Sequence, residues 1–308
     1  MPAKTPFKGR LAIALAAMLA GACQEKAPDA PPPTVTPAAP DAPDTRAKQE
    51  LLVLAASSLT DAFKQVEREL ELKHPNVDVL LSFAASSAVA LQIDQGGTGD
   101  VLATASEEHL QKLVAAGLIK DNVVFAHNEL VVAVPKDNPA KIERFEDLAN
   151  AKRLVLGAPN VPVGQYADAL IKRAGEKLGA KFSEAVQAHV VSREANVRLV
   201  LAKVELGEAD AAIVYRSDIR APECKPAPDG TPAVPNACAG ARAIEVPAAL
   251  NQRATYPIGV ATRSKQPQLA HAFIEYVLSP EGQAAMAANG FIPARPPGHH
   301  PLSGPPSK

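Results

Sequence analysis

The stretch Leu54 to Phe63 reads LAASSLTDAF and joins two kinds of sequence pattern. The apolar run Leu51 to Ala56 has the length and composition of a buried strand. From Leu59 onward, apolar residues recur at the spacing of an amphipathic helix. Ser58 and Asp61 stand at the spacing of a capping box, so the sequence predicts that Ser58 caps this helix. A strand followed directly by a helix is the repeating unit of α/β proteins.

The same alternation continues from Glu50 to Pro293. Short apolar runs predict strands, and runs with a helical period predict the helices between them. The predicted strands are 51–56, 77–83, 100–105, 129–135, 153–157, 211–215 and 256–262. The predicted helices are 59–70, 88–93, 107–119, 145–150, 166–179, 197–207, 269–279 and 280–290. This order predicts an α/β fold with parallel sheets.

Two further strand-to-helix junctions resemble the first. Ser86 and Ser87 follow the strand at 77–83, and the sequence from Val161 to Gly164 follows the strand at 153–157. In parallel α/β sheets such junctions lie at the carboxyl edge of the strands, where ligands bind. Helix starts offer unpaired amides and the positive end of the helix dipole to anions. Several such junctions, if they converge, would form a cage for an anion.

Six blocks of the sequence carry a family resemblance through their order and intervals. They are AASSLTDAF, SFAASSAVALQI, GDVLATAS, RLVLGAPNVPVGQYA, ANVRLVLAKVELGEADAAIVYRSD and YPIGVAT. Together they resemble the periplasmic molybdate-binding proteins of ABC transporters, over about residues 51–293. The resemblance implies a type II periplasmic binding protein fold, with two α/β lobes joined by crossing strands. Lobe one would comprise 49–128 plus 255–293, and lobe two would comprise 129–254.

The resemblance also implies which residues bind the oxyanion in the cleft between the lobes. Lobe one would supply the hydroxyls of Ser58 and Ser86, and lobe two would supply Val163, Val197 and the hydroxyl of Tyr215. Hydroxyls and helix-start amides can all donate, and a fully ionised tetrahedral dianion presents only acceptors. Such a cage disfavours protonated phosphate, whose O–H would lack an acceptor, whereas only cavity size would exclude sulfate. Molybdate and tungstate are nearly equal in size, so the sequence does not indicate which of the two is preferred.

Two positions depart from the family pattern. Val163 stands where alanine is common, so its larger side chain either points away from the pocket or narrows it. Asn196 stands where aspartate is frequent, so helix capping is retained while a negative charge is lost. Tyr166, beside Gly164, is interpreted as a packing residue.

The implied mechanism is hinge closure around the oxyanion. The ligand would stabilise a closed form that an inner-membrane permease, with its ATPase, recognises. The resemblance implies a monomer that carries out no covalent chemistry and needs no cofactor apart from its molybdate or tungstate ligand.

The N-terminus has the features of an export signal. Three basic residues precede the apolar stretch LAIALAAMLAGA, which predicts a signal peptide over 1–22. Leu19 to Cys23 resembles a lipobox, which would make Cys23 a lipidated first residue, whereas Ala20 to Ala22 also fits ordinary cleavage. We favour the lipoprotein and expect a location in the periplasm or cell envelope, tethered to a membrane.

Residues 23–48 and 294–308 are rich in proline and contain no apolar periodicity. The first segment is predicted to be an extended spacer that follows the lipid anchor, and the second a disordered tail. Cys224 and Cys238 flank the loop-like sequence KPAPDGTPAVPNA. In an oxidising compartment they predict one disulfide that contributes about 3 kcal/mol. No histidine or second cysteine pair at zinc spacing lies nearby.

Composition and motifs also bear on the other functional classes. A formal net charge of −1, without basic runs interleaved with aromatics, disfavours nucleic-acid binding. An exported serine hydrolase would use Ser58 or Ser86, but neither a G-x-S-x-G nor an S-x-x-K motif surrounds them. A receptor for sulfate or another oxyanion, or a lipid-tethered sensor with the same lobes, stays open as an alternative.

Overall fold

The computed structural model describes residues 48–219 and 240–294, which belong to one compact unit. Several predictions fall outside the described residues: the signal peptide, most of the spacer and of the tail, and the roles of Cys23, Cys224 and Cys238. In the part of the chain that is described, no helix combines the length and apolar character needed to cross a membrane.

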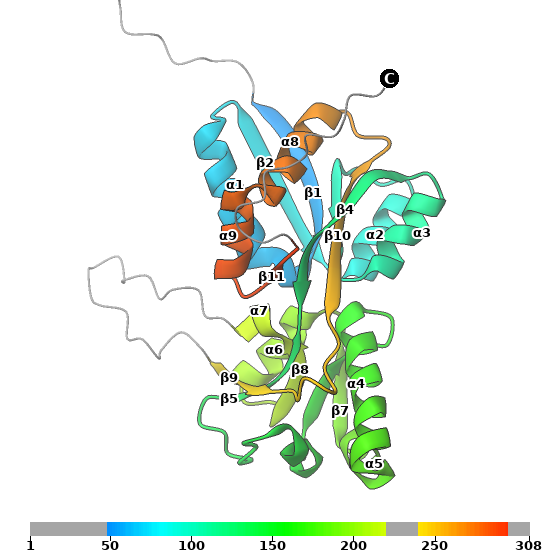
Figure 1. Ribbon diagram of the computed structural model, residues 1–308, viewed down its shortest axis with the longest axis vertical. Coiled ribbons are helices and arrows are strands. Elements are labelled where there is room, and N and C mark those ends of the chain that lie inside the picture. The colour runs from blue at the N-terminus through cyan, green and yellow to red at the C-terminus, as the bar shows by residue number, and fades with distance from the viewer. Residues whose placement is uncertain (1–47, 220–239, 295–308) are drawn as a thin grey trace, which may run out of the picture. The chain divides into compact units, whose positions relative to one another are not determined.

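Lobe one is built around a six-stranded sheet (Figure 1). Its strands, in spatial order, are β11 (Ile292–Pro293), β4 (Ile119–Asn128), β10 (Ala254–Ala261), β3 (Val101–Ala103), β1 (Gln49–Ala56) and β2 (Val77–Ala84). Its helices are η1 (Ser57–Leu59), α1 (Thr60–Lys73), α2 (Ser86–Asp94), α3 (Glu107–Ala115), α8 (Pro267–Leu278) and α9 (Pro280–Ala288). Strand β1 runs parallel to both β2 and β3, whereas β10 is antiparallel to β3 and β4.

Lobe two is built around a five-stranded sheet. Its strands, in spatial order, are β7 (Val190–Glu194), β6 (Leu154–Gly157), β8 (Ala211–Tyr215), β5 (Leu130–Pro135) and β9 (Ala241–Glu245). Its helices are η2 (Phe145–Asn150), α4 (Pro162–Leu178), α5 (Ala180–Ala188), α6 (Val197–Glu205) and α7 (Arg216–Ile219). Strand β6 is parallel to β7 and β8, whereas β5 is antiparallel to β8 and β9.

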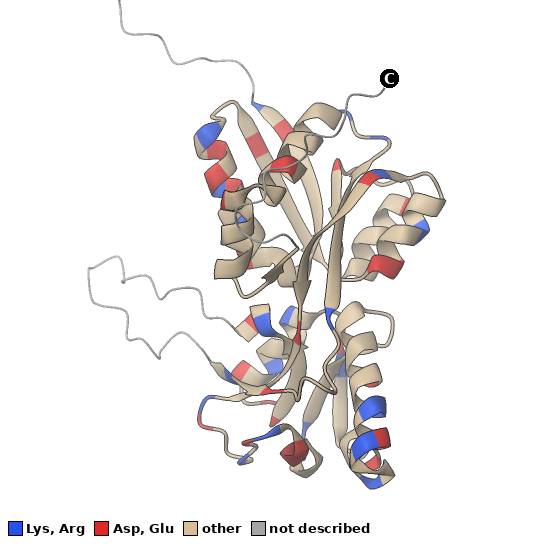
Figure 2. Ribbon diagram, viewed as in Figure 1, with Lys and Arg blue, Asp and Glu red and all other residues tan. Residues whose placement is uncertain are grey.

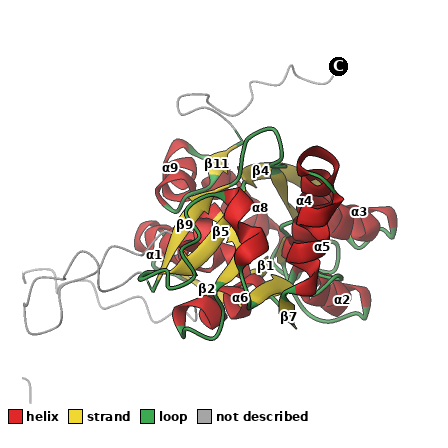
Figure 3. Ribbon diagram, turned by 90° about the horizontal axis from the view of Figure 1, so that it is seen from below, coloured by secondary structure: helices red, strands yellow, loops and turns green. Residues whose placement is uncertain are grey.

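The chain passes between the two sheets at two places. Strand β4 leads into β5 through Glu129, and the segment after β9 returns the chain to β10, as Figure 1 shows. Helices flank the strands on either side (Figure 3), so the central strands carry continuous buried apolar runs such as Leu130 to Val134. Acidic and basic residues are interspersed over the helices of both lobes (Figure 2), in line with the small net charge.

The predicted elements are all present, but the sheets are mixed rather than wholly parallel. The helix predicted over 107–119 was too long, because Gly117 adopts a φ of 70° after α3 and Ile119 already begins β4. Strand β4 was missed because half of its sequence, IKDNVVFAHN, is polar. Helix α5 and strands β7 and β9 were missed as well.

Candidate functional site

Three helix starts and one strand end surround a small cavity between the lobes. The cavity measures about 20 Å³, a little above the roughly 10–15 Å³ that one water molecule needs. Its lining residues are Ala56, Ser57, Ser58, Ala85, Ser86, Ala105, Val161, Pro162, Val163, Asn196, Val197 and Tyr215. All five residues implied by the sequence resemblance therefore meet at one place. A space of this size suits a small inorganic ion and not a sugar or a peptide.

Ser58 is placed by η1, not by a capping box, so the predicted capping role was wrong. Helix α1 has Leu59 as its N-cap, without any side-chain cap, and Thr60 Oγ1 donates to the Ser57 carbonyl over 2.7 Å. The buried Ser58 Oγ instead lies 2.9 Å from the hydroxyl of Tyr256 in β10. This hydroxyl therefore lies at the cavity, held by a second hydroxyl behind it.

Ser86 is the first residue of α2, and its side chain does not cap the helix either. Its Oγ accepts a hydrogen bond of 2.9 Å from the backbone amide of Ala105, which follows β3. A backbone amide can only donate, so the Ser86 hydroxyl hydrogen is left for another partner. Ser86 is buried and lines the cavity, so it is oriented as a donor toward it.

The start of α4 brings Val163 to the cavity. Val161 is the N-cap and Pro162 the first helical residue, so Val163 carries the first amide of this helix. A Cβ at Gly164 would lie 2.1 Å from the Ala158 carbonyl oxygen, so only glycine lets α4 approach the end of β6 this closely. One methyl of Val163 occupies space that a side chain at Gly157 would need. The bulk that distinguishes valine from alanine is thus partly accommodated against Gly157.

The start of α6 brings Val197 to the cavity. Asn196 is its N-cap, and Asn196 Oδ1 accepts a hydrogen bond of 3.1 Å from the Leu199 amide. This confirms the prediction that asparagine caps the helix in place of aspartate. Val197 is the first helical residue, and amides in a first turn lack partners within the helix.

Tyr215 ends β8 and is almost completely buried. Its ring packs edge-on against Tyr166 and Tyr256, with centroid distances of 6.3 and 5.9 Å. Within the described residues its hydroxyl makes no hydrogen bond of normal geometry, although the Tyr256 hydroxyl is close enough to influence it. Burial, and then the neighbouring tyrosines, raise the pKa of Tyr215 well above its usual value. Tyr215 is therefore a neutral donor with an unused hydrogen.

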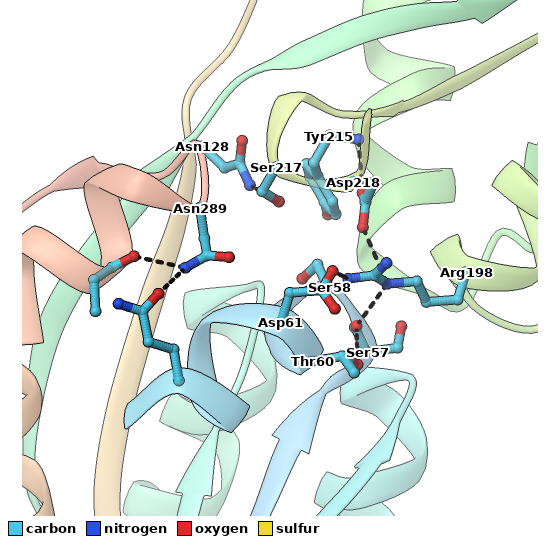
Figure 4. A network of polar contacts seen from close by, with 12 residues as sticks. Ser57, Ser58, Thr60, Asp61, Asn128, Arg198, Tyr215, Ser217, Asp218 and Asn289 are labelled. Atoms are coloured by element: carbon cyan, nitrogen blue, oxygen red, sulfur yellow. Dashed lines mark hydrogen bonds and ion pairs between the residues drawn. The ribbon is translucent and has the colours of Figure 1, made fainter. Parts of the chain in front are cut away.

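No charged side chain lines the cavity among the residues that the structure describes, but a charged cluster lies just beside it (Figure 4). It consists of Asp61, Arg198 and Asp218. Asp218 is completely buried, and its Oδ2 accepts from the Tyr215 amide over 3.1 Å. Burial raises the pKa of Asp218 to about 7, against the opposing effects of Arg198 and this amide.

Sequence reasoning missed the supporting residues Tyr256, Arg198 and Asp218. All three stand inside the quoted blocks: Arg198 follows Val197, Asp218 is the last residue of IVYRSD, and Tyr256 is the first residue of YPIGVAT. Proximity to predicted ligands was the only available signal, because their partners are distant in sequence.

The described residues around the cavity supply hydrogen-bond donors, but neither serine contacts a group that could act as a general base. The Ser58 hydroxyl contacts Tyr256, whose pKa burial raises well above normal, and the Ser86 hydroxyl contacts an amide. Neither partner can take a proton from serine near neutral pH, so the site lacks the nucleophile-and-base pair of a serine hydrolase.

A larger groove of about 490 Å³ lies elsewhere in lobe one. Its lining includes the apolar side chains of Leu52, Leu80 and Ile93 and the glycine-rich turn from Gly96 to Gly99. It lacks the converging helix starts that characterise the small cavity, so we place the candidate site at the latter.

Fold and cavity together define a type II periplasmic binding protein, as the sequence resemblance implied. Residues 51–292 match the family of bacterial extracellular solute-binding proteins, and the chain belongs to this family.

Proteins similar to this chain in sequence or in fold include two whose names state an anion. It is 31% identical to the molybdate-binding protein ModA of Mycobacterium tuberculosis over 258 residues, which cover 83% of this chain and 89% of the relative. It is 29% identical to the putative ABC transporter substrate-binding lipoprotein YvgL of Bacillus subtilis, over 80% of this chain and 88% of the relative. The solved sulfate-binding protein SubI of M. tuberculosis has the same fold, with a TM-score of 0.68 and 18% identity over 80% of this chain and 88% of that one.

Proposed function

We propose that this protein is the extracytoplasmic binding component of an ABC importer for molybdate and tungstate. The observation that carries the proposal is a cavity of about 20 Å³ that is lined by five residues able to donate hydrogen bonds and, within the described part of the chain, by no charged side chain. The donors are the hydroxyls of Ser58, Ser86 and Tyr215 and the helix-start amides of Val163 and Val197. The similarity to a mycobacterial molybdate-binding protein over most of both chains supports the choice of ligand.

The donor set favours an anion that is fully ionised. Every oxygen of such a dianion accepts, and the positive ends of the α2, α4 and α6 dipoles offset its charge. Monohydrogen phosphate would bring one O–H into a cage without an acceptor, at a cost of about 1–3 kcal/mol. Sulfate differs only in its shorter bonds, so the fixed positions of the helix starts would have to exclude it.

Binding would couple the lobes, because the serines belong to lobe one and the remaining donors to lobe two. An oxyanion held by both lobes stabilises the closed form, which a permease and its ATPase would recognise. The relative named as a lipoprotein supports tethering through Cys23, with residues 24–48 as the spacer. Replacing Cys23 by serine should then release the protein from the membrane fraction.

Calorimetric titration with molybdate, tungstate, sulfate and phosphate tests the proposal. We expect tight binding of the first two and none of the last two. Absence of binding by all four would refute an oxyanion receptor.

The second candidate function is a sulfate receptor, which the fold of SubI favours. Equal affinity for sulfate and molybdate in the same titration would select it and would show that the cavity exerts no size filter. A competition titration, with sulfate present in excess during addition of molybdate, measures the ratio directly.

A further inference from the structure

Arg198 reaches from lobe two to lobe one beside the cavity. It follows Val197 in the first turn of α6, and its Nη2 lies 2.5 Å from Asp61 Oδ2 in α1 (Figure 4). Its Nε donates to the backbone carbonyl of Ser57 over 3.3 Å. The same Nε lies 3.7 Å from Oδ1 of Asp218, which belongs to lobe two. One guanidinium thus faces acceptors of both lobes.

These contacts join the two segments that carry oxyanion donors. Ser57 precedes Ser58 in η1, and Arg198 follows Val197 in α6, so the guanidinium fixes a lobe-one hydroxyl relative to a lobe-two amide. Arg198, Asp61 and Asp218 do not line the cavity. Their effect on a bound anion is therefore exerted through the placement of Ser58 and Val197.

The position of this ion pair is unusual within the molecule. Among ion pairs formed between two described residues, Asp61 with Arg198 is the one that joins the lobes. Both side chains are about one-third exposed, at 34% and 31%. The pair is shielded enough to contribute, yet open enough to break when the lobes separate.

We propose that Arg198 is a positioning residue that latches the lobes together and slows release of the oxyanion. The proposal rests on the proposed function for its ligand, but the latch itself is a property of the two lobes. The planar guanidinium presents several donors in one plane, which lysine cannot reproduce. Since the latch forms only as the lobes meet, it affects release more than capture.

The test compares Asp61→Asn, Arg198→Met and the double variant with the wild type. Molybdate association and release are followed by stopped-flow tyrosine fluorescence, because the chain contains no tryptophan. We expect each single variant to accelerate release roughly five- to tenfold with association within about twofold, and the double variant to add little. Arg198→Lys should fall between wild type and Arg198→Met.

Arg153→Met is the matched control. Arg153 pairs with Asp210 over 2.7 Å within lobe two, immediately before β6 and β8, at the edge of the sheet opposite the cavity. This control should leave release unchanged even if it lowers thermal stability. Release at the wild-type rate in Arg198→Met would overturn the latch, because this variant loses the contacts with both Asp61 and the Ser57 carbonyl of lobe one.

Small-angle X-ray scattering of the same purified proteins separates the latch from the proposed function. With molybdate omitted, Asp61→Asn and Arg198→Met should shift the population toward more open molecules, with a larger radius of gyration than wild type or Arg153→Met. Failure of wild type to bind any oxyanion, together with this shift, would refute the function and retain the latch. Identical radii in all four proteins would refute the latch.

Discussion

The two lobes meet the proposed anion with different kinds of donor. Lobe one offers the side-chain hydroxyls of Ser58 and Ser86, each held by a protein partner behind it. Lobe two offers backbone amides at the starts of α4 and α6, and one side chain, Tyr215. The lobe-one donors depend on residue type, whereas two of the lobe-two donors depend on where a helix begins.

This difference decides how each half of the site can be altered. Truncating a serine removes a donor directly. An amide is removed by substitution with proline or by displacement of the helix start that presents it. We therefore expect the residues packed behind α4 to influence affinity as well.

Gly164→Ala should have the largest effect, although it removes no donor. Its Cβ would approach backbone oxygen atoms of Ala158 and Gly157 to 2.1 and 2.6 Å, so the start of α4 must move. Overpacking of this kind costs about 1–3 kcal/mol of stability. Affinity for molybdate should fall more than about a hundredfold, because Val163 and the dipole of α4 are both displaced. Calorimetry and thermal unfolding measure the two effects.

Gly175→Ala, in the same helix, is the matched control for that substitution. Its Cβ would lie 2.4 Å from Ser183 Oγ and 2.8 Å from Ser183 Cβ, so it strains the contact with α5 near the other end of α4, away from the cavity. Wild-type affinity is expected for this variant. If Gly164→Ala also binds normally, the amide of Val163 is not part of the site.

Ser58→Ala and Ser86→Ala test the side-chain half of the comparison. Each removes a hydrogen bond to a charged ligand, worth roughly 1.5–3 kcal/mol of binding free energy. Both should also lower stability, because Tyr256 and the Ala105 amide lose their buried partners. Ser87→Ala provides the control, since Ser87 follows Ser86 without lining the cavity. Unchanged affinity in both Ser58→Ala and Ser86→Ala would exclude the proposed site.

The sequence located the residues that line the cavity better than it located the residues that hold them in place. Strand-to-helix junctions are local patterns, so Ser58, Ser86 and the start of α4 could be located from periodicity and turn residues. The capping box at Ser58 failed because a tertiary contact with Tyr256, 198 residues away, competes with the local hydrogen bond.

Long-range pairings explain most of the other errors. Strand β4 was missed because its polar residues are tolerated by pairing with β10 and β11, which no local pattern reveals. The ion pair between Asp61 and Arg198 spans 137 positions and depends on how the lobes meet. Val163 and Val197 could be singled out only through the family resemblance, because a backbone donor leaves no mark on residue type.

Tyr215→Phe tests the one side-chain donor of lobe two, whose other proposed donors are backbone amides. The hydroxyl has no hydrogen bond of normal geometry within the described residues, so stability should be unchanged or slightly higher. Affinity should fall by about 1.5 kcal/mol, the lower end of the range for a hydrogen bond to a charged ligand. A loss of stability comparable to that of Ser58→Ala would contradict the assignment of an unused hydrogen.

Asp218 provides the smallest expected effect on affinity, because it contacts the Tyr215 amide and not the cavity. Its pKa is about 7 in the folded protein and near the ordinary value of 3.8 when unfolded, so the folded state binds the extra proton between these values. Stability contributed by this group is therefore fully present below pH 3.8 and is lost as pH rises toward 7, with a slope of at most about 1.4 kcal/mol per pH unit.

Asp218→Asn should remove this slope while its amide oxygen still accepts from the Tyr215 amide. Denaturant unfolding of both proteins across the interval from pH 4 to pH 8 measures the difference, and affinity for molybdate should change less than about threefold. Parallel stability profiles for wild type and Asp218→Asn would mean that Asp218 stays ionised, and that Arg198 balances two negative charges instead of one.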